Sequence, residues 1–405
     1  MTQVKMFAAS NGDAFLIKDK SLDGSAVLID GGFASTYQNE IRSELAAMGR
    51  EGRALDLVIA THIDADHISG LIKFFTDNGS ASSPRIVEVR RVWHNSLRSM
   101  PVPSSRPRRE LSRDDDSLIY EIRRMGFTLS HEPSRPDEEI GAKQGSSLAA
   151  LLLKGGYTWN ESTGRSAIDS STSELALGSN SRVSVLGPKP ERLEALVRQW
   201  IAELQRLGLI GNVLEGERFD DAFEFLNAAE KMSRRLNFEE IGHSQKSDKP
   251  LQEAYLPDDS LNNGSSIAVC IETPSSNMLF LGDSWAEDIE EAIEKRAHKR
   301  LPLVFDAIKI SHHGSMRNTS CRLLALVDSP IFLISTNGAK HGHPDLPVLH
   351  EIVDRPSAFV RHLHFSYSTP ESRQIANYKS RSGAAFTVHE NSNDWINISS
   401  TKDYD

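Results

Sequence analysis

The sequence has few cysteines and no long apolar run. Only Cys270 and Cys321 occur among 405 residues, too few and too far apart for a disulfide framework or a CxxC metal motif. Both are expected to be buried, reduced thiols, which favours a cytoplasmic location. No apolar stretch reaches the roughly 18 residues that a membrane span needs, so no membrane association is expected. The first residues also lack the pattern of a leader peptide.

The chain is also poor in aromatic residues and in positive charge. Aromatic residues make up 7% of the sequence, and the formal net charge is −10 at pH 7, which argues against a basic coat or a stacking ladder for nucleic acid. The basic residues gather locally, in the Arg-, Ser- and Pro-rich stretch Arg98–Arg113, which is predicted to be a mobile loop. Folded over a site, this loop would hold phosphates; the alternative is a solvated loop balanced by Asp114–Asp116.

Strand patterns stand towards both ends of the chain, and helical patterns lie between them. Short apolar runs predict strands at Val4–Ala9, Phe15–Lys18, Ala26–Ile29, Leu57–Ala60, Ile86–Trp93, Arg182–Leu186, Ser266–Glu272, Met278–Leu281, Phe305–Ile310, Ile331–Ile334, Ala358–His364 and Ala384–Val388. Apolar residues at helical spacing predict helices at Thr36–Met48, Asp66–Phe75, Ser117–Met125, Ser146–Leu153, Pro190–Leu207, Asp220–Leu236, Trp285–His298, Thr319–Val327 and Leu346–Asp354.

This order of elements predicts an α/β (α+β) fold. Residues 1–95 and 180–360 are expected to form one αββα sandwich, since a mixed sheet covered by helices is among the few stable layered architectures. Residues 95–180 are interpreted as a loop insertion, residues 190–260 as a helical insertion and residues 360–405 as a C-terminal extension. The helical insertion is expected to be a lid or a packing elaboration; the alternative is a surface for a protein partner.

Histidines are clustered, and each cluster follows a predicted strand. Six of the 14 histidines fall in three tight pairs, and strand ends are where a scaffold holds functional side chains rigidly. The pairs are His62 and His67, His312 and His313, and His341 and His343.

The segment after the strand Leu57–Ala60 carries four potential metal ligands within six residues. They are His62, Asp64, Asp66 and His67. Burying that many polar and charged groups without partners would cost several kcal/mol each, and a bound cation would remove this cost. The alternative is an ordinary solvated turn, which the recurrence of histidine pairs at other strand ends makes less favourable.

The segment Thr61–His67 resembles the HxHxDH signature of the metallo-β-lactamase superfamily, in the HxDxDH variant. That variant is typical of the hydrolase domain of the DNA-uptake channel ComEC and its soluble relatives, which include stand-alone bacterial proteins of antiviral defence. Other segments resemble motifs of this branch in the same order, and an ordered set is far more specific than any one of its parts. They are Gly12–Ile17, Leu28–Gly32, Asn263–Ile267, Leu279–Asp283, Ile308–Ser315, Ser335–Gly338 and His341–Pro344.

The resemblance implies an αββα metallo-hydrolase that binds two divalent metal ions, Zn or Mn. Asp283 would bridge the two metals, and His312, or alternatively His313, would complete the second site. Asp30 would orient the motif loop; the alternative is a plain turn aspartate. The remaining ligands would be His62 and Asp64 for the first metal, and Asp66 and His67 for the second.

The first metal lacks the third histidine that most of the superfamily supplies. Asn263 and Ser266 occupy that region instead, so this site is poorer in nitrogen, and donor softness then allows Mn²⁺ as well as Zn²⁺. His94 could fill the gap; the favoured alternative is a surface histidine without that role.

The chemistry implied is hydrolysis by a metal-activated hydroxide. Asp66 would orient the hydroxide, and His343 would donate a proton or contact the substrate; a loop histidine without a role is the alternative. The favoured substrate is a phosphoester, with the protein acting as a phosphodiesterase or a nuclease. The alternatives are a hydrolase of a carbonyl substrate, such as a lactam, thioester or lactone, and a non-enzymatic partner-binding module in a bacterial defence complex.

Overall fold

The computed structural model divides the chain into two compact units. Unit 1 comprises Met1–Ile29, Asp169–Lys189 and Glu240–Asp405, and unit 2 comprises Asp30–Ile168 and Pro190–Glu239. The structure describes residues 1–21, 24–100, 110–125, 146–178, 180–211, 216–237, 249–297, 301–340 and 342–400. Most of the Arg-rich loop, residues 101–109, lies outside these ranges, as does His341.

Unit 1 is built on an eight-stranded sheet in the order β17-β16-β15-β13-β11-β10-β9-β8. The strands from β11 to β17 pair in parallel, and those from β8 to β11 pair antiparallel. Parallel strands end at a common edge, so the loops that follow β11, β13 and β15 meet there. The strands are β8 (Leu175–Leu177), β9 (Ser181–Gly187), β10 (Ala268–Thr273), β11 (Ser276–Phe280), β13 (Ala307–Lys309), β15 (Ile331–Ile334), β16 (Arg361–Phe365) and β17 (Phe386–His389).

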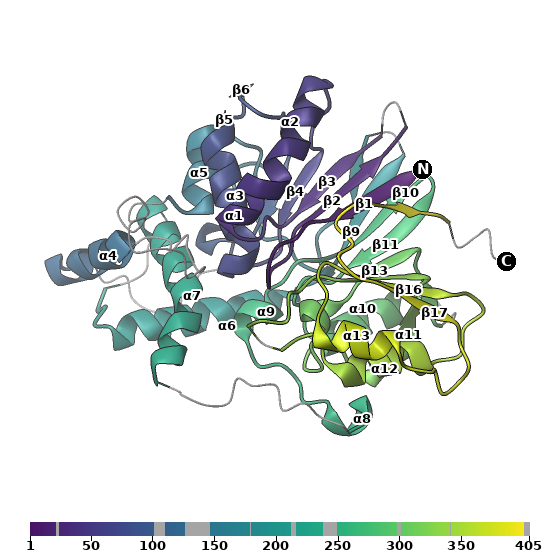
Figure 1. The fold of residues 1–405 in the computed structure, drawn as a ribbon. Coiled ribbons are helices and arrows are strands. Elements are labelled where there is room, and N and C mark those ends of the chain that lie inside the picture. Colours follow the sequence, from purple (N-terminus) through teal and green to yellow (C-terminus); the bar gives the residue numbers. More distant parts are fainter. Residues whose placement is uncertain are drawn as a thin grey trace. The chain divides into compact units, whose positions relative to one another are not determined.

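Helices cover one face of this sheet (Figure 1). Their apolar stripes pack on the sheet in one buried cluster, which includes Ile289, Leu323, Val348 and Ile375. Burial of each such side chain contributes about 1.5–3 kcal/mol. The helices are α10 (Ala286–Arg296), α11 (Cys321–Leu326), α12 (Leu346–Asp354) and α13 (Pro370–Ala376), with the short α8 (Leu251–Ala254) beside α12.

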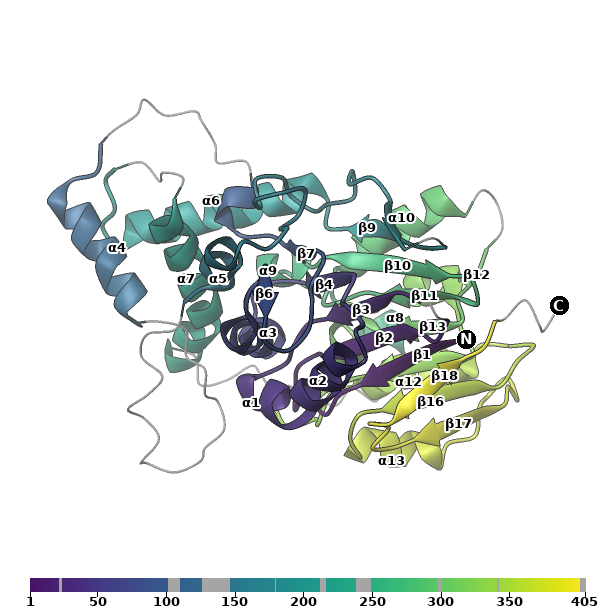
Figure 2. The same cartoon turned by 90° about the horizontal axis from the view of Figure 1, so that it is seen from above.

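The other face of the sheet packs on a second, antiparallel set of strands. Phe15 meets Phe280 edge to face with ring centroids 5.6 Å apart, and the Oγ1 atoms of Thr2 and Thr273 lie 2.7 Å apart. Figure 2 shows β18 alongside β1. These strands are β1 (Thr2–Met6), β2 (Phe15–Asp19), β3 (Ala26–Ile29) and β18 (Trp395–Ile398). Unit 1 thus has a helix–sheet–sheet layering, and the predicted α/β fold class is confirmed.

Short elements complete unit 1. None of the helices in the described ranges has the length and apolarity that a membrane crossing requires. The remaining elements are the parallel pair β12 (Leu303–Val304) and β14 (Val327–Asp328), the helical turn α9 (Leu261–Gly264) and the 3₁₀ turn η3 (Ser311–Gly314).

Unit 2 contains the parallel strands β4 and β7 and the long helix α3, whose inward face is apolar and buried. The fully buried run of β4 predicts a strand that is covered on both faces. The elements are α1 (Ala34–Thr36), the π-turn η1 (Tyr37–Ile41), α2 (Arg42–Arg50), β4 (Leu57–Ala60), α3 (Ala65–Asn78), β5 (Gly79–Ser80), β6 (Ser83–Pro84), β7 (Val92–His94), η2 (Leu97–Ser99), α4 (Arg113–Met125), α5 (Leu148–Gly155), α6 (Pro190–Arg206) and α7 (Glu217–Asn237).

Helix α7 ties the inserted segments of unit 2 together through three buried acidic residues. Asp220 binds Arg98 in η2, with a nitrogen–oxygen distance of 2.7 Å, and Asp221 binds Arg123 in α4 at 3.0 Å. Glu224 accepts the backbone N–H of Leu148 at 2.7 Å, at the start of α5, where a carboxylate also complements the helix dipole. Parts of the two predicted insertions therefore contact one another within unit 2, namely η2, α4 and α5 from the first and α7 from the second.

The structure differs from the sequence prediction in several elements. The strand predicted at Ile86–Trp93 is shortened to Val92–His94, and α13, β8 and β18 were not predicted. Residues 361–398, set apart by the sequence as an extension, add strands to both sheets of unit 1. Cys270 is buried as expected, whereas Cys321 is only partly buried.

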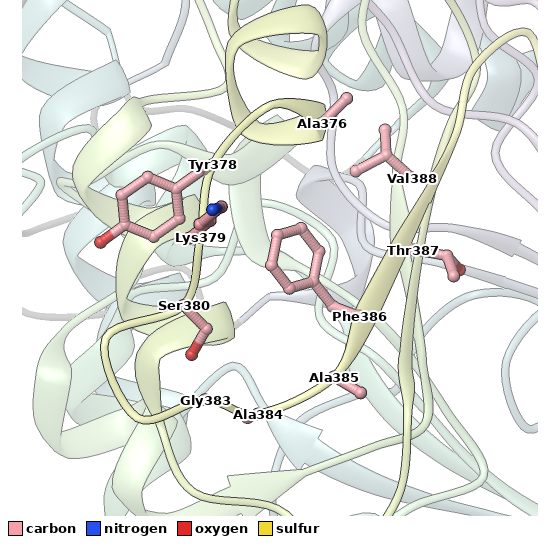
Figure 3. A pocket seen from close by; sticks show the side chains of 10 residues that line it. All are labelled: Ala376, Tyr378, Lys379, Ser380, Gly383, Ala384, Ala385, Phe386, Thr387 and Val388. Carbon is pink, nitrogen blue, oxygen red and sulfur yellow. The ribbon is translucent and has the colours of Figure 1, made fainter.

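Two cavities lie on unit 1 away from the clustered histidines of the motifs. One, of about 550 Å³, lies between the end of α13 and β17, and Figure 3 shows Tyr378 and Phe386 among its lining side chains. The other, of about 610 Å³, is lined by residues of β16, β17 and β18, among them His362, His364 and His389. Neither cavity contains a residue that the sequence singled out for catalysis or metal binding.

Candidate metal centre

In unit 2, four candidate ligands lie between the end of β4 and the first turn of α3. His62, Asp64, Asp66 and His67 are all at most 5% exposed. Asp64 is the extended residue immediately before α3, and its Oδ2 lies 3.2 Å from Nε2 of His62. The apolar strand fixes one end of this segment and the helix fixes the other, so the ligands are held by regular elements.

Asp30 orients both histidines of this segment. Its Oδ1 accepts the backbone N–H of Thr61 at 2.8 Å, and its Oδ2 accepts the Thr61 hydroxyl at 2.7 Å. Oδ2 also lies 2.8 Å from Nδ1 of His67. The Thr61 hydroxyl has one hydrogen, which it donates to Asp30, so it accepts from Nδ1 of His62 at 3.1 Å. In both histidines Nδ1 thus carries the hydrogen, and Nε2 is the nitrogen able to bind a cation.

Two glycines bring Asp30 to this position. The N–H of Gly31 donates to the carbonyl of His67 at 2.8 Å, and that of Gly70 donates to the carbonyl of Gly32 at 2.9 Å. A Cβ on Gly70 would lie 1.8 Å from the Gly31 oxygen, a separation that no side chain can occupy. The backbones of the loop and of α3 therefore touch, which explains why glycine stands at both positions.

In unit 1, the loops after β11 and β13 bring a carboxylate and two imidazoles together. Oδ2 of Asp283 lies 3.6 Å from Nε2 of His312 and 4.0 Å from Nε2 of His313. Ligand atoms of these three residues lie within 4.8 Å of one another. The parallel pairing of β11 with β13 produces this meeting, and both histidines, the predicted ligand and its alternative, are within reach.

The histidine pair sits in an unusual left-handed turn. His312 has φ 46° and His313 has φ 58°, a conformation that costs residues with a side chain about 1–3 kcal/mol each. Gly314, with φ 86°, closes the turn, and a Cβ there would lie 2.8 Å from Pro344. The backbone N–H of His312 donates to the Gly282 carbonyl at 2.9 Å. Such strain is retained where it places functional side chains.

Each histidine of the pair also has its Nδ1 held by an oxygen. Nδ1 of His313 donates to the main-chain carbonyl of Ser335 at 2.6 Å and lies 3.2 Å from Asp13. Nδ1 of His312 lies 2.8 Å from Oδ1 of Asn318. Burial lowers the pKa of His312 to about 4, against the opposing effect of Asp283. The ring is therefore neutral at pH 7, as metal ligation requires.

A buried lysine lies near one of the two carboxylate oxygens of Asp283, and the histidines lie near the other. Lys309 is 1% exposed, and its ammonium pairs with Asp13, donates to the Gly282 carbonyl at 2.9 Å and lies 3.9 Å from Oδ1 of Asp283. Oδ1 thus faces the ammonium, while Oδ2 faces the two imidazoles. A single positive charge beside two buried carboxylates also reduces the cost of burying them.

His343 lies at the edge of this cluster. Its ring centroid is 5.3 Å from that of His312, and its Nδ1 is 3.4 Å from Oδ2 of Asp345, the residue before α12. The structure therefore brings His343 beside the candidate ligands of unit 1.

His94 and Asn263, the candidates for the missing third ligand, have other partners. The expectation that His94 is a surface histidine is wrong, because its side chain is fully buried; its Nε2 pairs with Glu224 at 2.9 Å and its ring stacks on Trp159. The Asn263 amide donates to Asp258 at 2.6 Å. Among the described residues, His94 belongs to no cluster of His, Cys, Asp or Glu side chains suited to a metal ion, whereas Oδ1 of Asn263 is buried and accepts no hydrogen bond.

Several residues of these networks carried no sequence signal. Asn318 and Asp258 are ordinary polar residues between motifs, and only the fold shows that Asn318 reaches His312 and that Asp258 reaches Asn318. Asp13 and Lys309 lie inside recognisable motifs, but a lysine in an apolar strand gives no indication of which carboxylates it faces.

The donor set suits divalent cations. Four histidines, His62, His67, His312 and His313, have Nδ1 held by an oxygen, an arrangement that fixes ring orientation and raises the basicity of Nε2 in metal-binding histidines. Carboxylates stand beside these nitrogens in each unit. Imidazole suits Zn²⁺ and carboxylate oxygen suits Mn²⁺, so the residues present fit either ion.

Residues 9–128 match the family model of the metallo-beta-lactamase superfamily. Members of the metallo-beta-lactamase superfamily are mostly metallo-hydrolases. The ComEC-like branch inferred from the HxDxDH variant stays a prediction.

Solved structures of two proteins were found to be similar. One is the metallo-beta-lactamase fold protein YhfI from Bacillus subtilis, with a TM-score of 0.37, 9% identity and 98% of each chain covered. The other is a long form RNase Z from yeast, with a TM-score of 0.34 and 11% identity; 99% of this chain but only 47% of that one is covered. No similar sequence is found among curated proteins.

Proposed function

We propose that this chain is a metal-dependent phosphodiesterase whose substrate is a nucleic acid or another phosphodiester. The proposal rests on an arrangement that the four motif histidines His62, His67, His312 and His313 share. In each of them Nδ1 is held by an oxygen, and in each unit carboxylates lie beside the pair. Its ligands are proposed to be His62, Asp64, Asp66, His67, Asp283 and His312.

The choice of a phosphoester rests on the oxygen content of the donor set. Three of the six proposed ligands are carboxylates, and in the two-cation sites of phosphatases, polymerases and nucleases the cations stabilise the attacking and leaving oxygens of the displacement at phosphorus. Carboxylate donors also suit Mn²⁺, which favours phosphate oxygens over softer ligands. Arg98, at the start of the Arg-rich region, pairs with Asp220. Phosphate binding by residues 101–109 stays a prediction.

The chain's residues would divide the work of hydrolysis. Bound cations supply the Lewis acidity that ionises water near neutral pH and stabilises charge on the attacked group. Asp66 would orient the attacking water, whose proton would pass to solvent and whose oxygen would bond to phosphorus as the ester P–O bond breaks. His343, beside Asp345, would donate the proton that the leaving oxygen takes up. Asp30 and Lys309 would hold His67 and Asp283 in place.

The test is hydrolysis of bis(nitrophenyl) phosphate and of single- and double-stranded nucleic acid with Mn²⁺ or Zn²⁺. Asp66→Ala should abolish turnover and leave the fold intact. Asp77→Ala is the matched control: this carboxylate lies at the other end of α3 in an ion pair with Lys73, and its loss should leave turnover unchanged, because such pairs contribute about 1 kcal/mol or less.

Other outcomes would redirect the assignment. Turnover of a lactam, thioester or lactone without phosphodiester cleavage would favour a carbonyl substrate. Metal binding without turnover of any of them would favour a partner-binding module. A protein partner of the helical insertion and a role in antiviral defence stay predictions.

A further inference from the structure

We propose that Asp258 and Asn318 are positioning residues that fix which ring nitrogen of His312 carries the hydrogen, and so present its Nε2 for metal binding. The inference rests on the proposed role of His312 as a ligand. The property it assigns, the tautomer of one histidine, exists in the metal-free protein and can be measured there.

The orientation of the Asn318 amide follows from its surroundings. Its Nδ2 lies 3.0 Å from Oδ2 of Asp258 and 3.0 Å from the main-chain oxygen of Asp283. Both of these oxygens are acceptors, so the NH₂ group must face them. Oδ1 is thereby turned to His312, 2.8 Å from its Nδ1. An amide oxygen cannot donate, so the hydrogen between the two atoms belongs to Nδ1 of His312.

A second amide competes for the same ring nitrogen. Nδ2 of Asn263 lies 3.4 Å from Nδ1 of His312, and a donor there would favour the opposite tautomer, with the hydrogen on Nε2. The same Nδ2 lies only 2.6 Å from Oδ2 of Asp258. Asp258 therefore acts twice: it orients the Asn318 amide and it engages the competing amide of Asn263.

Asp258 is itself held firmly. It is 8% exposed, its Oδ1 accepts the N–H of Ser260 at 3.3 Å, and its own N–H donates to the Arg317 carbonyl at 3.1 Å. The loop before α9 is thereby tied to the loop after η3. A rigid acceptor supported in this way defines ring orientation more sharply than a mobile side chain would.

The experiment reads the tautomer directly, by long-range ¹H–¹⁵N NMR of the metal-free full-length chain with ¹⁵N-labelled histidine. The His312 signal is assigned by its loss in His312→Ala. Wild type should show the hydrogen on Nδ1. Asn318→Ala should move it to Nε2, because Asn263 then becomes the neighbouring donor. Asn377→Ala, at the exposed end of α13, should change nothing.

Metal affinity provides the second readout. Asn318→Ala should weaken Zn²⁺ or Mn²⁺ binding about 10–100-fold, the range found when a partner of a ligating histidine is removed. Asn263→Ala removes the competing donor and should keep the hydrogen of His312 on Nδ1. Thermal unfolding of each variant shows whether it is folded.

The outcomes separate this inference from the proposed function. A wild-type His312 with its hydrogen on Nε2, or an Asn318→Ala variant that keeps it on Nδ1, overturns the positioning role even if the protein binds metal and hydrolyses phosphodiesters. The expected tautomers in a protein that binds no divalent metal and has no turnover support the positioning role and contradict the proposed function.

Discussion

Nδ1 of His67 lies 2.8 Å from Oδ2 of Asp30, and the same carboxylate also binds the backbone and hydroxyl of Thr61. Asp30 has φ 56°, a conformation that aspartate tolerates better than most residues. One side chain thus links the strand-to-helix segment to the orientation of its ligands.

Asp30→Asn should weaken metal binding more than it weakens the fold. An asparagine has one acceptor oxygen in place of two, so its amide nitrogen replaces either Oδ1, which loses the bond from the Thr61 N–H, or Oδ2, which loses the bonds from the Thr61 hydroxyl and from Nδ1 of His67. Divalent metal affinity is expected to fall about 10–100-fold, measured by competition with a chromophoric chelator. Unchanged affinity would show that Asp30 is a plain turn residue.

Gly70→Ala should destabilise unit 2. The added Cβ would lie 1.8 Å from the Gly31 oxygen, so the loop that carries Asp30 must move, at a cost of about 1–3 kcal/mol or more. Urea unfolding should register this loss. Gly52→Ala is a control without a close approach, since a Cβ there meets nothing within 4 Å, although its φ of 69° adds about 1 kcal/mol of backbone strain, so Gly70→Ala should lose more stability. Equal stability losses in the two variants would count against the backbone contact.

We expect unit 1 to lose folding stability at acidic pH because of a histidine on β16. Burial, with smaller effects from His389 and His362, lowers the pKa of His364 from 6.5 to about 3. A histidine with a lowered folded-state pKa stabilises the fold above its unfolded pKa, and this stability is lost as pH falls below about 6.5. At pH 5 the loss from His364 is about 2 kcal/mol.

The comparison of wild type with His364→Asn isolates this contribution. Urea unfolding at pH 7 and at pH 5 should show a smaller pH-dependent loss in the variant, because asparagine does not titrate. An identical loss in both proteins would mean that His364 takes up its proton in the folded state as readily as in the unfolded one.

The periodicity of the sequence correctly predicted the elements whose apolar residues are the ones buried in the fold. Ile331–Ile334 is fully buried and apolar, and Leu346–Asp354 has clear helical spacing, so both bounds agree with the structure. β18 alternates weakly and depends on pairing with β1, nearly 400 residues away in sequence. Such non-local pairing leaves little trace in a local pattern.

The same division holds at the candidate site. The motif spacing pointed to His62, Asp64, Asp66 and His67 because ligands at the end of a strand are close in sequence. The residues that orient the ligands, such as Asn318, act through side-chain distances that depend on the folded loops. The prediction that His94 is exposed failed for the same reason, because the residue that pairs with it, Glu224, follows 130 residues later in the sequence.

The central claim is that the carboxylates and imidazoles of the candidate metal centre bind divalent cations. Elemental analysis of purified protein tests it most directly. The samples are wild type, His67→Ala and Asp283→Asn, each dialysed against buffer with trace Zn²⁺ and Mn²⁺. The account predicts about two equivalents of divalent metal in wild type and a clear loss in each variant. A wild-type protein without stoichiometric metal, or variants that retain the full amount, would contradict it.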